Sequence, residues 1–463
     1  MTMQIAEIDM PASRSTPRQV LAVVCFAMVL ANLDLFIVNV ALPDISVEFG
    51  HARLEDLSWV LNGYAIIFAS LLVFFGRLCE RYRRDRSFLL GVALFTVASA
   101  ACAAANDVPS LVGFRLAQAV GAALMTPTSL GLLLATFPPE RRGGAIRAWA
   151  SIGGLAAAFG PVVGGLLVTV SWRWIFIVNV PLGIAALAFG LWKLPEVPGH
   201  DVPRPDGWGA ALITAGIAAL TLGLVKGSDW GWSSPAIVAS LAGAVVLLAI
   251  FAVHCLRAEN PRVDPVLFHS RNFSGATLAA VPFGIAFGAM LLSLVLWEQG
   301  SWGWSALKTG LAIAPGPFLV PITSLFIAGR LIQRFGAACV ILLGLVFFSG
   351  GCAWWAVFVQ LTPSVPVAMV GILMTGVGVG LAMPTIVSTA AAALPPSSFA
   401  TGSGIVNMIR QTGLAVGVAI LVAIVGSAVA PSDRLAAFKI AWRVMAAITA
   451  SSALPLLLLQ RKS

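Results

Sequence analysis

The chain has 463 residues, of which 59% are hydrophobic and only 10% are charged, and its formal net charge at pH 7 is +9. A typical soluble domain carries about 25% charged residues, so this composition excludes an ordinary water-soluble protein. It indicates a chain that exposes most of its surface to lipid.

Apolar runs close to the ~20 residues needed to cross a bilayer as a helix follow one another along the whole chain. They do not alternate apolar and polar residues, as the strands of a membrane barrel would. The sequence therefore predicts an all-α, polytopic membrane protein with fourteen transmembrane helices. The predicted spans are residues 19–42, 57–76, 88–106, 111–136, 145–168, 173–193, 208–226, 235–256, 273–297, 308–329, 337–359, 364–388, 402–428 and 437–458.

The polar connections between the spans predict the orientation of the chain. Residues 1–18 are polar, and the apolar run after them is too long for a signal-peptide core, so we expect an uncleaved N-terminal segment. Arginines gather in connections on the same side as this segment, above all at 77–86 and 141–147. Because cytoplasmic connections are enriched in lysine and arginine, we predict a protein of the cytoplasmic membrane with both termini in the cytoplasm. The same bias explains the net charge without a nucleic-acid partner.

No motif for metal, cofactor or nucleotide chemistry is apparent. The six cysteines lie in or beside the spans without CxxC spacing, and the four histidines lack the spacing of metal ligands. We expect the cysteines to be small core residues, and we expect neither a metal nor a cofactor. None of the five lysines follows a glycine, so the chain has no Walker A phosphate loop and does not hydrolyse ATP. We therefore expect no enzymatic activity.

An internal repeat predicts the domain organisation. The segment GRLCERYRRDRSFLLG at 76–91 returns as GRLIQRFGAACVILLG at 329–344, and VGAALMTPT at 120–128 returns as VGVGLAMPT at 377–385. The two separations are nearly equal, which predicts two six-helix bundles in the same orientation, residues 19–193 and 273–463. Residues 194–272 are then a linker with an inserted helix pair. Parallel repeats of this kind are one construction of secondary transporters.

Four motifs carry a resemblance to a known family. The segment at 76–91 resembles the loop motif G-x-L-x-D-R-x-G-R-K of the major facilitator superfamily, with Glu80, Arg83 and Asp85 as departures. LDLFIVNVALP at 33–43, RLAQAVGAA at 115–123 and GPVVGG at 160–165 are similar to motifs of helices 1, 4 and 5 in its fourteen-helix drug:proton antiporter branch. The resemblance covers nearly the whole chain. It implies export of small lipophilic compounds, drugs or antibiotics, in exchange for protons by alternating access.

The resemblance leaves the substrate and part of the function open. An exporter or proton symporter of a specific metabolite fits the same motifs, and a non-transporting membrane receptor or enzyme is the alternative from a different class. We expect a monomer whose partners are a small lipophilic substrate, protons and the lipid bilayer. A single deep acid does not favour divalent organic cations, so we expect neutral or monovalent substrates.

Two charged residues inside the spans are the predicted proton-coupling pair. Asp34 lies about eight residues, or ~12 Å, from the outer end of its span, and Arg115 lies about four residues, or ~6 Å, from the outer end of its own. An uncompensated charge in a span is costly, so the two are expected to meet. An Asp34 that faces the cavity beside a cation could bind a proton from outside and release it inside. The alternative is a permanently ionised pair that only fixes helix packing.

Polar and aromatic residues within the spans are candidates for the substrate cavity, because pockets for drug-sized ligands combine apolar walls with a few polar groups. The predicted substrate-binding residues are Asn39, Trp59, Asn62, Tyr64, Gln118, Phe287, Asn407, Arg410 and Gln411. Arg410 could instead extend to the cytoplasmic surface.

Other polar and aromatic residues near the outer ends are predicted to lie at the membrane interface. Glu298, at the end of the span 273–297, is expected to be a solvated interfacial residue. The predicted membrane anchors are Trp172, Trp174, Trp230, Trp232, Trp302 and Trp304.

Two further motifs are predicted to form gates. At the cytoplasmic surface, ion pairs between helix ends can favour the inward-closed or the inward-open state, whereas the alternative is plain orientation by positive charge. This set is Gly76, Glu80, Arg81 and Arg84. In the fifth span, small residues and a proline permit close backbone approach and bending at a moving interface, the alternative being ordinary helix packing. This set is Gly160, Pro161, Gly164 and Gly165.

Overall fold

The computed structural model describes residues 16–199, 205–258, 265–394, 399–426 and 430–459, so most of the predicted N-terminal segment lies outside the described residues. Within these ranges the chain is helical and contains no strand. The first part contains α1 (Pro17–Glu48), α2 (Leu54–Arg81), α3 (Arg84–Ala103), α4 (Val108–Thr136), α5 (Pro139–Val168), α6 (Trp174–Ile177), α7 (Asn179–Lys193), α8 (Gly207–Trp230) and α9 (Pro235–Arg257). The second part contains η1 (Pro265–His269), α10 (Arg271–Gly300), α11 (Ala306–Ile313), α12 (Pro315–Ile322), η2 (Thr323–Ala328), α13 (Gly329–Phe335), α14 (Ala337–Phe358), α15 (Val365–Ala392), α16 (Phe399–Val425), α17 (Pro431–Ser451) and η4 (Leu454–Leu458).

The helices match the lengths expected of a multi-pass membrane protein. Thirteen helical stretches among the described residues are long and apolar enough to cross a membrane. The remaining predicted span, 145–168, lies in α5, which is 30 residues long. Within α5, the stretch Phe159–Val168 is apolar but is too short by itself to cross a membrane. At 1.5 Å per residue α5 is also long enough to cross. The predicted all-α, polytopic architecture is confirmed.

Three predicted spans are not continuous helices. The span 173–193 falls on α6 and α7, and the span 437–458 falls on α17 and η4. The most divided span, 308–329, falls on α11, α12, the π-helical turn η2 and α13. Pro315 and Pro321 lack the N–H group that a continuous helix needs, so the hydrogen-bond ladder is interrupted there. A π-helical turn follows directly after α12.

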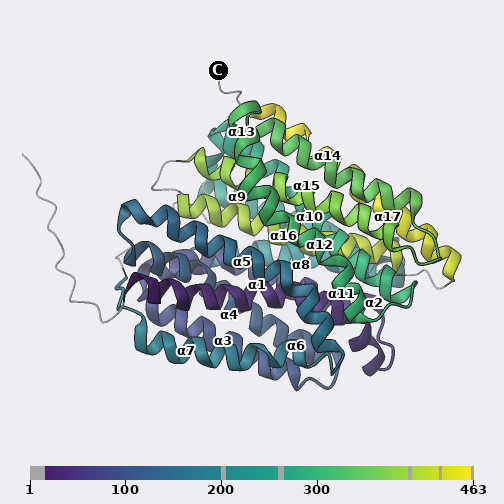
Figure 1. Ribbon diagram of the computed structural model, residues 1–463, viewed down its shortest axis with the longest axis horizontal. Helices are drawn as coiled ribbons and strands as arrows, with labels where there is room; N and C mark the ends of the chain where they lie inside the picture. Colours follow the sequence, from purple (N-terminus) through teal and green to yellow (C-terminus); the bar gives the residue numbers. More distant parts are fainter. Residues whose placement is uncertain (1–15, 200–204, 259–264, 395–398, 427–429, 460–463) are drawn as a thin grey trace, which may run out of the picture.

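The helices form two groups with the same internal packing. Helices α1 to α7 pack mainly on one another, as do α10 to α17, and Figure 1 shows them as a lower purple-to-teal group and an upper green-to-yellow group. A Cβ added to Gly121 on α4 would lie 2.6 Å from the backbone nitrogen of Phe95 on α3. A Cβ added to Gly378 on α15 would lie 2.6 Å from that of Phe348 on α14. The repeated sequence therefore builds the same close helix crossing twice.

The two groups meet along a small number of helix pairs. The principal pairs are α2 with α16 and α5 with α11 and α12, and α1 also contacts α10. A Cβ added to Gly165 on α5 would lie 2.6 Å from the carbonyl oxygen of Ala306 on α11. A Cβ on Gly310 would clash with the carbonyl oxygen of Pro161. Backbones of the two groups are therefore in near contact at α5 and α11.

The inserted helices α8 and α9 cover one of these seams. Ile213 and Ile217 of α8 share a buried apolar cluster with Ala65 of α2 and Met408 of α16. The Lys226 ammonium on α8 lies 2.5 Å from the Asp56 carboxylate on α2. Helix α9 packs on α8, and only 11% of the residues in its most apolar stretch are buried inside the protein. The pair therefore joins the fold through α8, with α9 at the periphery.

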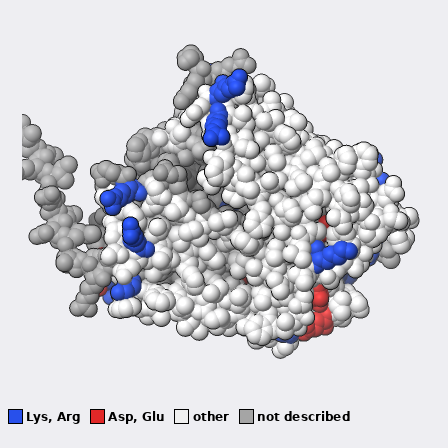
Figure 2. Space-filling model, in the orientation of Figure 1, with Lys and Arg blue, Asp and Glu red and all other residues white. Residues whose placement is uncertain are grey.

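Charged side chains lie at the two ends of the molecule, and an uncharged band separates them in Figure 2. We call the end where α1 begins and α2 ends the basic end, because it holds Arg81, Arg83 and Arg84. We call the opposite end, where α1 ends and α2 begins, the far end. An uncharged band between two charged ends is the surface that a bilayer requires.

Three of the six tryptophans expected at the membrane interface are instead buried, so that expectation is wrong for them. Trp172, Trp302 and Trp304 lie in the main apolar core. The indole N–H of Trp172 donates to Glu48, and that of Trp302 donates to the carbonyl oxygen of Gln360 at 2.8 Å. An indole whose N–H has a partner inside the protein can be buried at little cost. The other three, Trp174, Trp230 and Trp232, are exposed as membrane anchors require.

The cysteines follow the prediction with one exception. Cys339, at the start of α14, is exposed, whereas the other five are buried.

Candidate functional site

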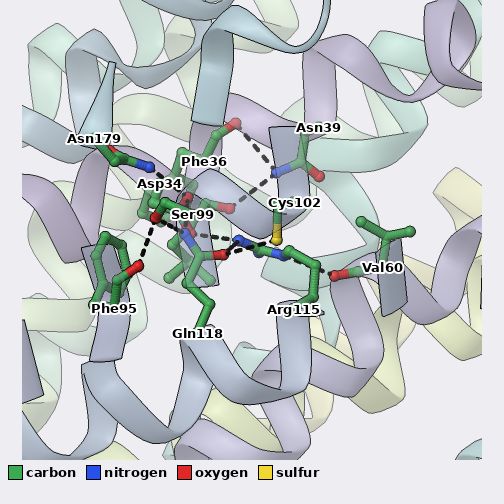
Figure 3. A network of polar contacts seen from close by, with 11 residues as sticks. Asp34, Phe36, Asn39, Val60, Phe95, Ser99, Cys102, Arg115, Gln118 and Asn179 are labelled. Atoms are coloured by element: carbon green, nitrogen blue, oxygen red, sulfur yellow. Dashed lines mark hydrogen bonds and ion pairs between the residues drawn. The ribbon is translucent and has the colours of Figure 1, made fainter. Parts of the chain in front are cut away.

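A buried ion pair joins α1 to α4 inside the first group of helices (Figure 3). Arg115 Nη1 lies 2.5 Å from Asp34 Oδ2, and both side chains have no exposed surface. The contact expected between these two residues is confirmed. A charge on an apolar helix is stabilised by an opposite charge on a neighbouring one, which explains why the two charged positions face each other.

Two amide side chains satisfy the remaining capacity of the carboxylate. Gln118 Nε2 and Asn179 Nδ2 donate to Asp34 Oδ1 at 2.9 and 3.0 Å. Gln118 Oε1 accepts a hydrogen bond from Arg115 Nη1 at 2.6 Å, and Gln118 Nε2 also donates to the Ser99 hydroxyl at 2.7 Å. The network thus connects α1, α3, α4 and α7. Gln118, which we predicted in the substrate cavity, is a member of this network and does not line the cavity.

The Arg115 guanidinium has further partners on α2 and α6. Arg115 Nε donates to the carbonyl oxygen of Val60 at 3.3 Å. The guanidinium carbon lies 4.1 Å from the ring centre of Tyr64 and 5.7 Å from that of Phe176. Cations over aromatic faces are stabilised most where water is absent. Tyr64, also predicted in the cavity, instead supports the guanidinium from within the core of the first group.

A small cavity of about 40 Å³ lies between the two groups of helices. Its walls come from α1, α2, α4, α10 and α16. The lining residues are Leu35, Phe36, Asn39, Leu61, Asn62, Ala65, Arg115, Gly288, Leu291, Leu414, Ala415 and Val418. Asn39 and Asn62 therefore lie where the sequence predicted them. The expectation that Asp34 itself faces the cavity is wrong, because Arg115 lines the cavity and binds the buried Asp34 carboxylate.

The cavity in this conformation is too small for a drug-sized ligand. A water molecule occupies about 30 Å³ in the liquid, and pockets for drug-sized ligands measure roughly 300 to 1,000 Å³. A large ligand therefore requires the two groups of helices to separate around this cavity.

Polar groups without partners surround the cavity. Within the described ranges, both polar atoms of the Asn62 amide are buried without a hydrogen-bond partner, and the same holds for Gln411 Oε1 and Arg410 Nε. Asn407 and Gln411 precede the cavity-lining Ala415 by eight and four residues, so they lie on the same face of α16, two turns and one turn nearer the basic end. Buried polar groups normally have partners, so groups such as these are available to a ligand or to water.

The aromatic residues of the predicted set lie in two different places. Phe287 is nearly buried and packs edge to face on the cavity-lining Phe36, with ring centres 6.4 Å apart. Trp59 packs instead on the cluster that joins α2 to α8 and is absent from the cavity wall.

The predicted glycine motif holds α5 between two neighbours. A Cβ on Gly160 would lie 2.8 Å from the Phe36 Cβ, and one on Gly164 would lie 2.9 Å from the Ile37 carbonyl oxygen, both on α1. Gly165 faces α11 of the other group, as described above. Pro161 is buried on the same helix. One stretch of α5 therefore contacts a helix of each group, and its role in gating stays a prediction.

Arg83, in the charge cluster after α2, forms ion pairs within the first group of helices. Arg83 binds Asp85 at 2.7 Å and Glu196 at 2.8 Å, and these two carboxylates raise the pKa of the Arg83 guanidinium. Asp85 Oδ1 also accepts a hydrogen bond from the backbone N–H of Val197 at 3.2 Å. The cluster therefore attaches the start of α3 to the segment after α7.

The remaining members of the predicted cytoplasmic gate lie beside this cluster. Arg84 approaches α4, since a Cβ added to Gly131 would lie 3.2 Å from Arg84 Cδ. Gly76 also lies close to α4, since a Cβ added to Gly76 would lie 3.7 Å from the Pro127 Cβ. Arg81 ends α2. The side chain of Glu80 lies outside the described part of the chain, and the gating roles of all four stay predictions.

Two members of the buried network are absent from the sequence-based set. Asn179 is an amide inside the apolar span 173–193, which is the same signal that identified Asn39 and Asn62. Ser99 gave no usable signal, because a serine inside a helix commonly bonds a carbonyl one turn earlier, and this one does donate to Phe95.

Glu298 is the clearest correction to the site. It was expected to be solvated at the membrane interface, but it has no exposed surface. Other parts of the fold cover its side chain, so its position near a helix end does not bring it to water.

The two similar groups of apolar helices, with an ion pair beside a cavity between them, define a multi-pass membrane transport protein. The sequence profile of the Major Facilitator Superfamily matches residues 24–418, and the chain belongs to this superfamily of transporters. It is thus a member of a transporter family.

Curated relatives and solved structures agree with this family. The chain is 31% identical over 428 residues to the tetracenomycin C resistance and export protein of Streptomyces glaucescens, covering 90% of this chain and 78% of that one. It is 32% identical over 416 residues to the methylenomycin A resistance protein of Bacillus subtilis (strain 168), covering 88% of each. A crystal structure of an auto inhibited POT family peptide transporter has the same fold, with a TM-score of 0.69, 17% identity and coverage of 95% and 96% of the two chains.

Proposed function

We propose that this protein exports small lipophilic compounds of the antibiotic type across the cytoplasmic membrane in exchange for protons. The two antibiotic resistance proteins to which the chain is similar support this substrate class. One observation carries the coupling: Arg115 binds the buried Asp34 carboxylate with one face of its side chain and lines the cavity between the bundles with another.

The network links the charge of Asp34 to the shape of the cavity. A proton on Asp34 removes the negative charge that holds Arg115, while the guanidinium stays charged. A buried cation without its counter-ion is unfavourable by several kcal/mol, so Arg115 then gains from moving toward the cavity and its water or ligand. A ligand in the cavity and a proton on Asp34 therefore compete through one side chain.

Asp34 exchanges its proton only after a rearrangement. It has no exposed surface in this conformation, and Arg115, Gln118 and Asn179 enclose its oxygens. A carboxylate that is closed to water in one state and reaches it in another is what alternating access requires, because a permanent path would let protons leak.

The distribution of charge supports one orientation of the molecule. We assign the basic end to the cytoplasm and the far end to the outside, following the bias of arginine and lysine toward the inner face. Residues 19–193 and 273–463 are then the two bundles that move against each other as a monomer. Residues 194–272 carry the inserted pair.

The substitution Asp34→Asn tests the proposal in proteoliposomes. We expect proton-driven efflux to fall to background, while counterflow of substrate without a proton gradient continues, because the amide cannot titrate but keeps the hydrogen-bonding shape. The matched control is Asp44→Asn, an exposed acid on the same helix, which retains proton-driven efflux. Full coupling in Asp34→Asn contradicts the mechanism.

A further inference from the structure

Glu298, in the last turn of α10, is a buried acid outside the network of Asp34. Its side chain has no exposed surface, and neither carboxylate oxygen has a hydrogen-bond partner among the described residues. Most buried carboxylates are paired, so an acid in this condition calls for an explanation.

The surroundings of Glu298 place it where the two bundles meet at the far end. The neighbouring Gln299 donates from Nε2 to the carbonyl oxygen of Val40 on α1 at 3.0 Å, which joins the bundles directly. The backbone N–H of Trp304, just before α11, donates to the carbonyl oxygen of Glu298 at 3.0 Å. Helices α1, α10 and α11 contact one another here. Glu298 therefore lies at a junction of three helices from both bundles.

Glu298 also lies on the cavity side of α10. Leu291 lines the cavity, and Glu298 follows it by seven residues on the same helix. Seven residues are two turns, or about 10 Å along the axis, and return to the same face. The acid therefore stands between the cavity and the far end, at the level where an exit to the outside has to open.

The far end is closed in this structure, whereas the basic end is held less tightly. At the far end the α5 and α11 backbones approach so closely that a Cβ on Gly165 would lie 2.9 Å from the Leu307 Cα. Toward the basic end, α13 packs mainly on α14 and η2 of its own bundle, and none of its residues is buried. Opening of the far end has to separate α11 from α5, and α10 from α1, around Glu298.

The chemistry of a carboxyl in this position depends on that opening. An ionised carboxylate without hydrogen-bond donors loses its hydration, which costs several kcal/mol, whereas a protonated carboxyl loses much less. The closed arrangement therefore holds Glu298 in its neutral form. Water admitted by opening solvates the ionised form and removes the penalty.

We propose that Glu298 is a second proton-binding site of this transporter, which takes up a proton as the far end closes and releases it as the far end opens. The inference rests on the proposed function only for the assignment of the far end to the outside. No other reactant takes part, since one proton joins a carboxylate to give a carboxyl group and later leaves it.

Charged groups on the surrounding elements do not replace the proton. Lys308 of α11 interacts electrostatically with Glu298 but lies 4.3 Å over the ring of Trp304 and forms no ion pair with Glu298 in the described structure. On α1, Asp44 is exposed and Glu48 binds Arg173. On α17, Arg434 donates to the carbonyl oxygen of Gly300.

The sign of the pH dependence follows from linkage. The closed far end binds one more proton than the open far end at Glu298, so a lower external pH favours closure and a higher external pH favours opening. A glutamine at position 298 imitates the neutral carboxyl and cannot ionise. It should therefore hold the far end closed at every pH.

Distance measurements between spin labels test this without any transport. Labels on Asn106→Cys and Thr362→Cys, two exposed far-end loop residues of the two bundles, report the opening in lipid nanodiscs. Every protein also carries Cys339→Ser, which removes the exposed native thiol, and Asp34→Asn, which removes the titration of the first acid. With Glu298 present we expect the label separation to lengthen from mildly acidic to mildly alkaline pH. With Glu298→Gln we expect the short separation throughout.

Two further variants separate titration from folding. Glu298→Asp keeps a carboxyl group and should restore the pH response, and Asp433→Asn, an exposed acid at the far end of the same bundle, should leave the response unchanged. A Glu298→Gln protein that opens with pH as its parent does would overturn the inference. If that happens while the native protein shows proton-driven efflux, the proposed function stands and only the role of Glu298 fails. If the pH response depends on Glu298 but no compound is exported, the role of Glu298 stands and the proposed function fails.

Discussion

At the scale of single residues, Arg115 carries more interactions than any other member of the described site. It binds the Asp34 carboxylate, the Gln118 amide and the Val60 carbonyl oxygen, and it lies against the Tyr64 ring. Only a planar guanidinium with several fixed donors can meet these partners together, so a lysine is not an equivalent substitute. The geometry explains how a proton on one acid can alter a cavity that the acid does not line.

The substitution Arg115→Gln should therefore lower the stability of the protein strongly. It leaves Asp34 ionised and buried without its cation, at an expected cost of about 3–5 kcal/mol in the free energy of unfolding. The double variant Asp34→Asn with Arg115→Gln should recover most of this loss, because neither charge remains.

Denaturant unfolding in detergent measures these differences. The control is Arg53→Gln, because the Arg53 guanidinium is exposed and its ion pairs are screened by water, so its removal should cost little stability. Equal losses in the single and the double variant would show that the charge of Asp34 is not what the guanidinium compensates.

At the scale of elements, α5 is the helix that contacts both bundles through its backbone. Gly160 and Gly164 bring it against α1, whereas Gly165 brings it against α11. The span of the second bundle that contacts α5 is the one interrupted at Pro315 and by η2. The glycines hold α5 close against its neighbours, whereas the facing span of the second bundle is irregular and can bend. The close contact between α5 and this span can therefore break and form again when the facing span changes shape.

The variant Gly165→Ala should weaken closure of the far end. Its new Cβ would lie 2.6 Å from the Ala306 carbonyl oxygen, and overpacking of this kind costs roughly 1–3 kcal/mol, which is about a fivefold to 150-fold change in the ratio of closed to open protein. The spin-label pair described above should report a larger open fraction, and efflux should fall. Gly113→Ala is the matched control, since a Cβ on Gly113 meets nothing within 4 Å. Identical open fractions in the two variants would separate this contact from gating.

At the scale of the whole molecule, the two bundles share one packing scheme but differ in charge. The Gly121 crossing of α3 and α4 and the Gly378 crossing of α14 and α15 have the same close approach. Asp34 and Arg115 have no charged counterpart in the second bundle, where Phe287 and Ile372 occupy the repeat-related positions. The repeat therefore provides the framework, and the asymmetry provides the chemistry.

The orientation of the molecule can be checked with its own exposed thiol. Cys339 begins α14 at the basic end, and the other native cysteines are buried. If the basic end faces the cytoplasm, a membrane-impermeant maleimide should label Cys339 in inverted vesicles but not in intact cells. A protein with Thr362→Cys in the Cys339→Ser background should show the opposite pattern. Labelling of Cys339 in intact cells would reverse the orientation.

The sequence by itself was enough for the framework of this protein. Apolar length predicts helices whatever their neighbours are, and a repeat of some 250 residues predicts two bundles, since both signals depend only on the order of residues. The rarity of charge within the spans identified Asp34 and Arg115 as partners, because a membrane leaves such residues few alternatives.

The tertiary structure alone decided which way the side chains face. Gln118 and Tyr64 support the ion pair, Trp59 lies in the α8 seam, and Asp34 lies behind Arg115, since a helical residue can face a cavity, a core or lipid with the same local sequence. The burial of Glu298 was equally hidden, because nearness to a helix end predicts water only when no other helix covers that end. Helix formation is a local property, whereas burial depends on residues that lie far apart in the chain.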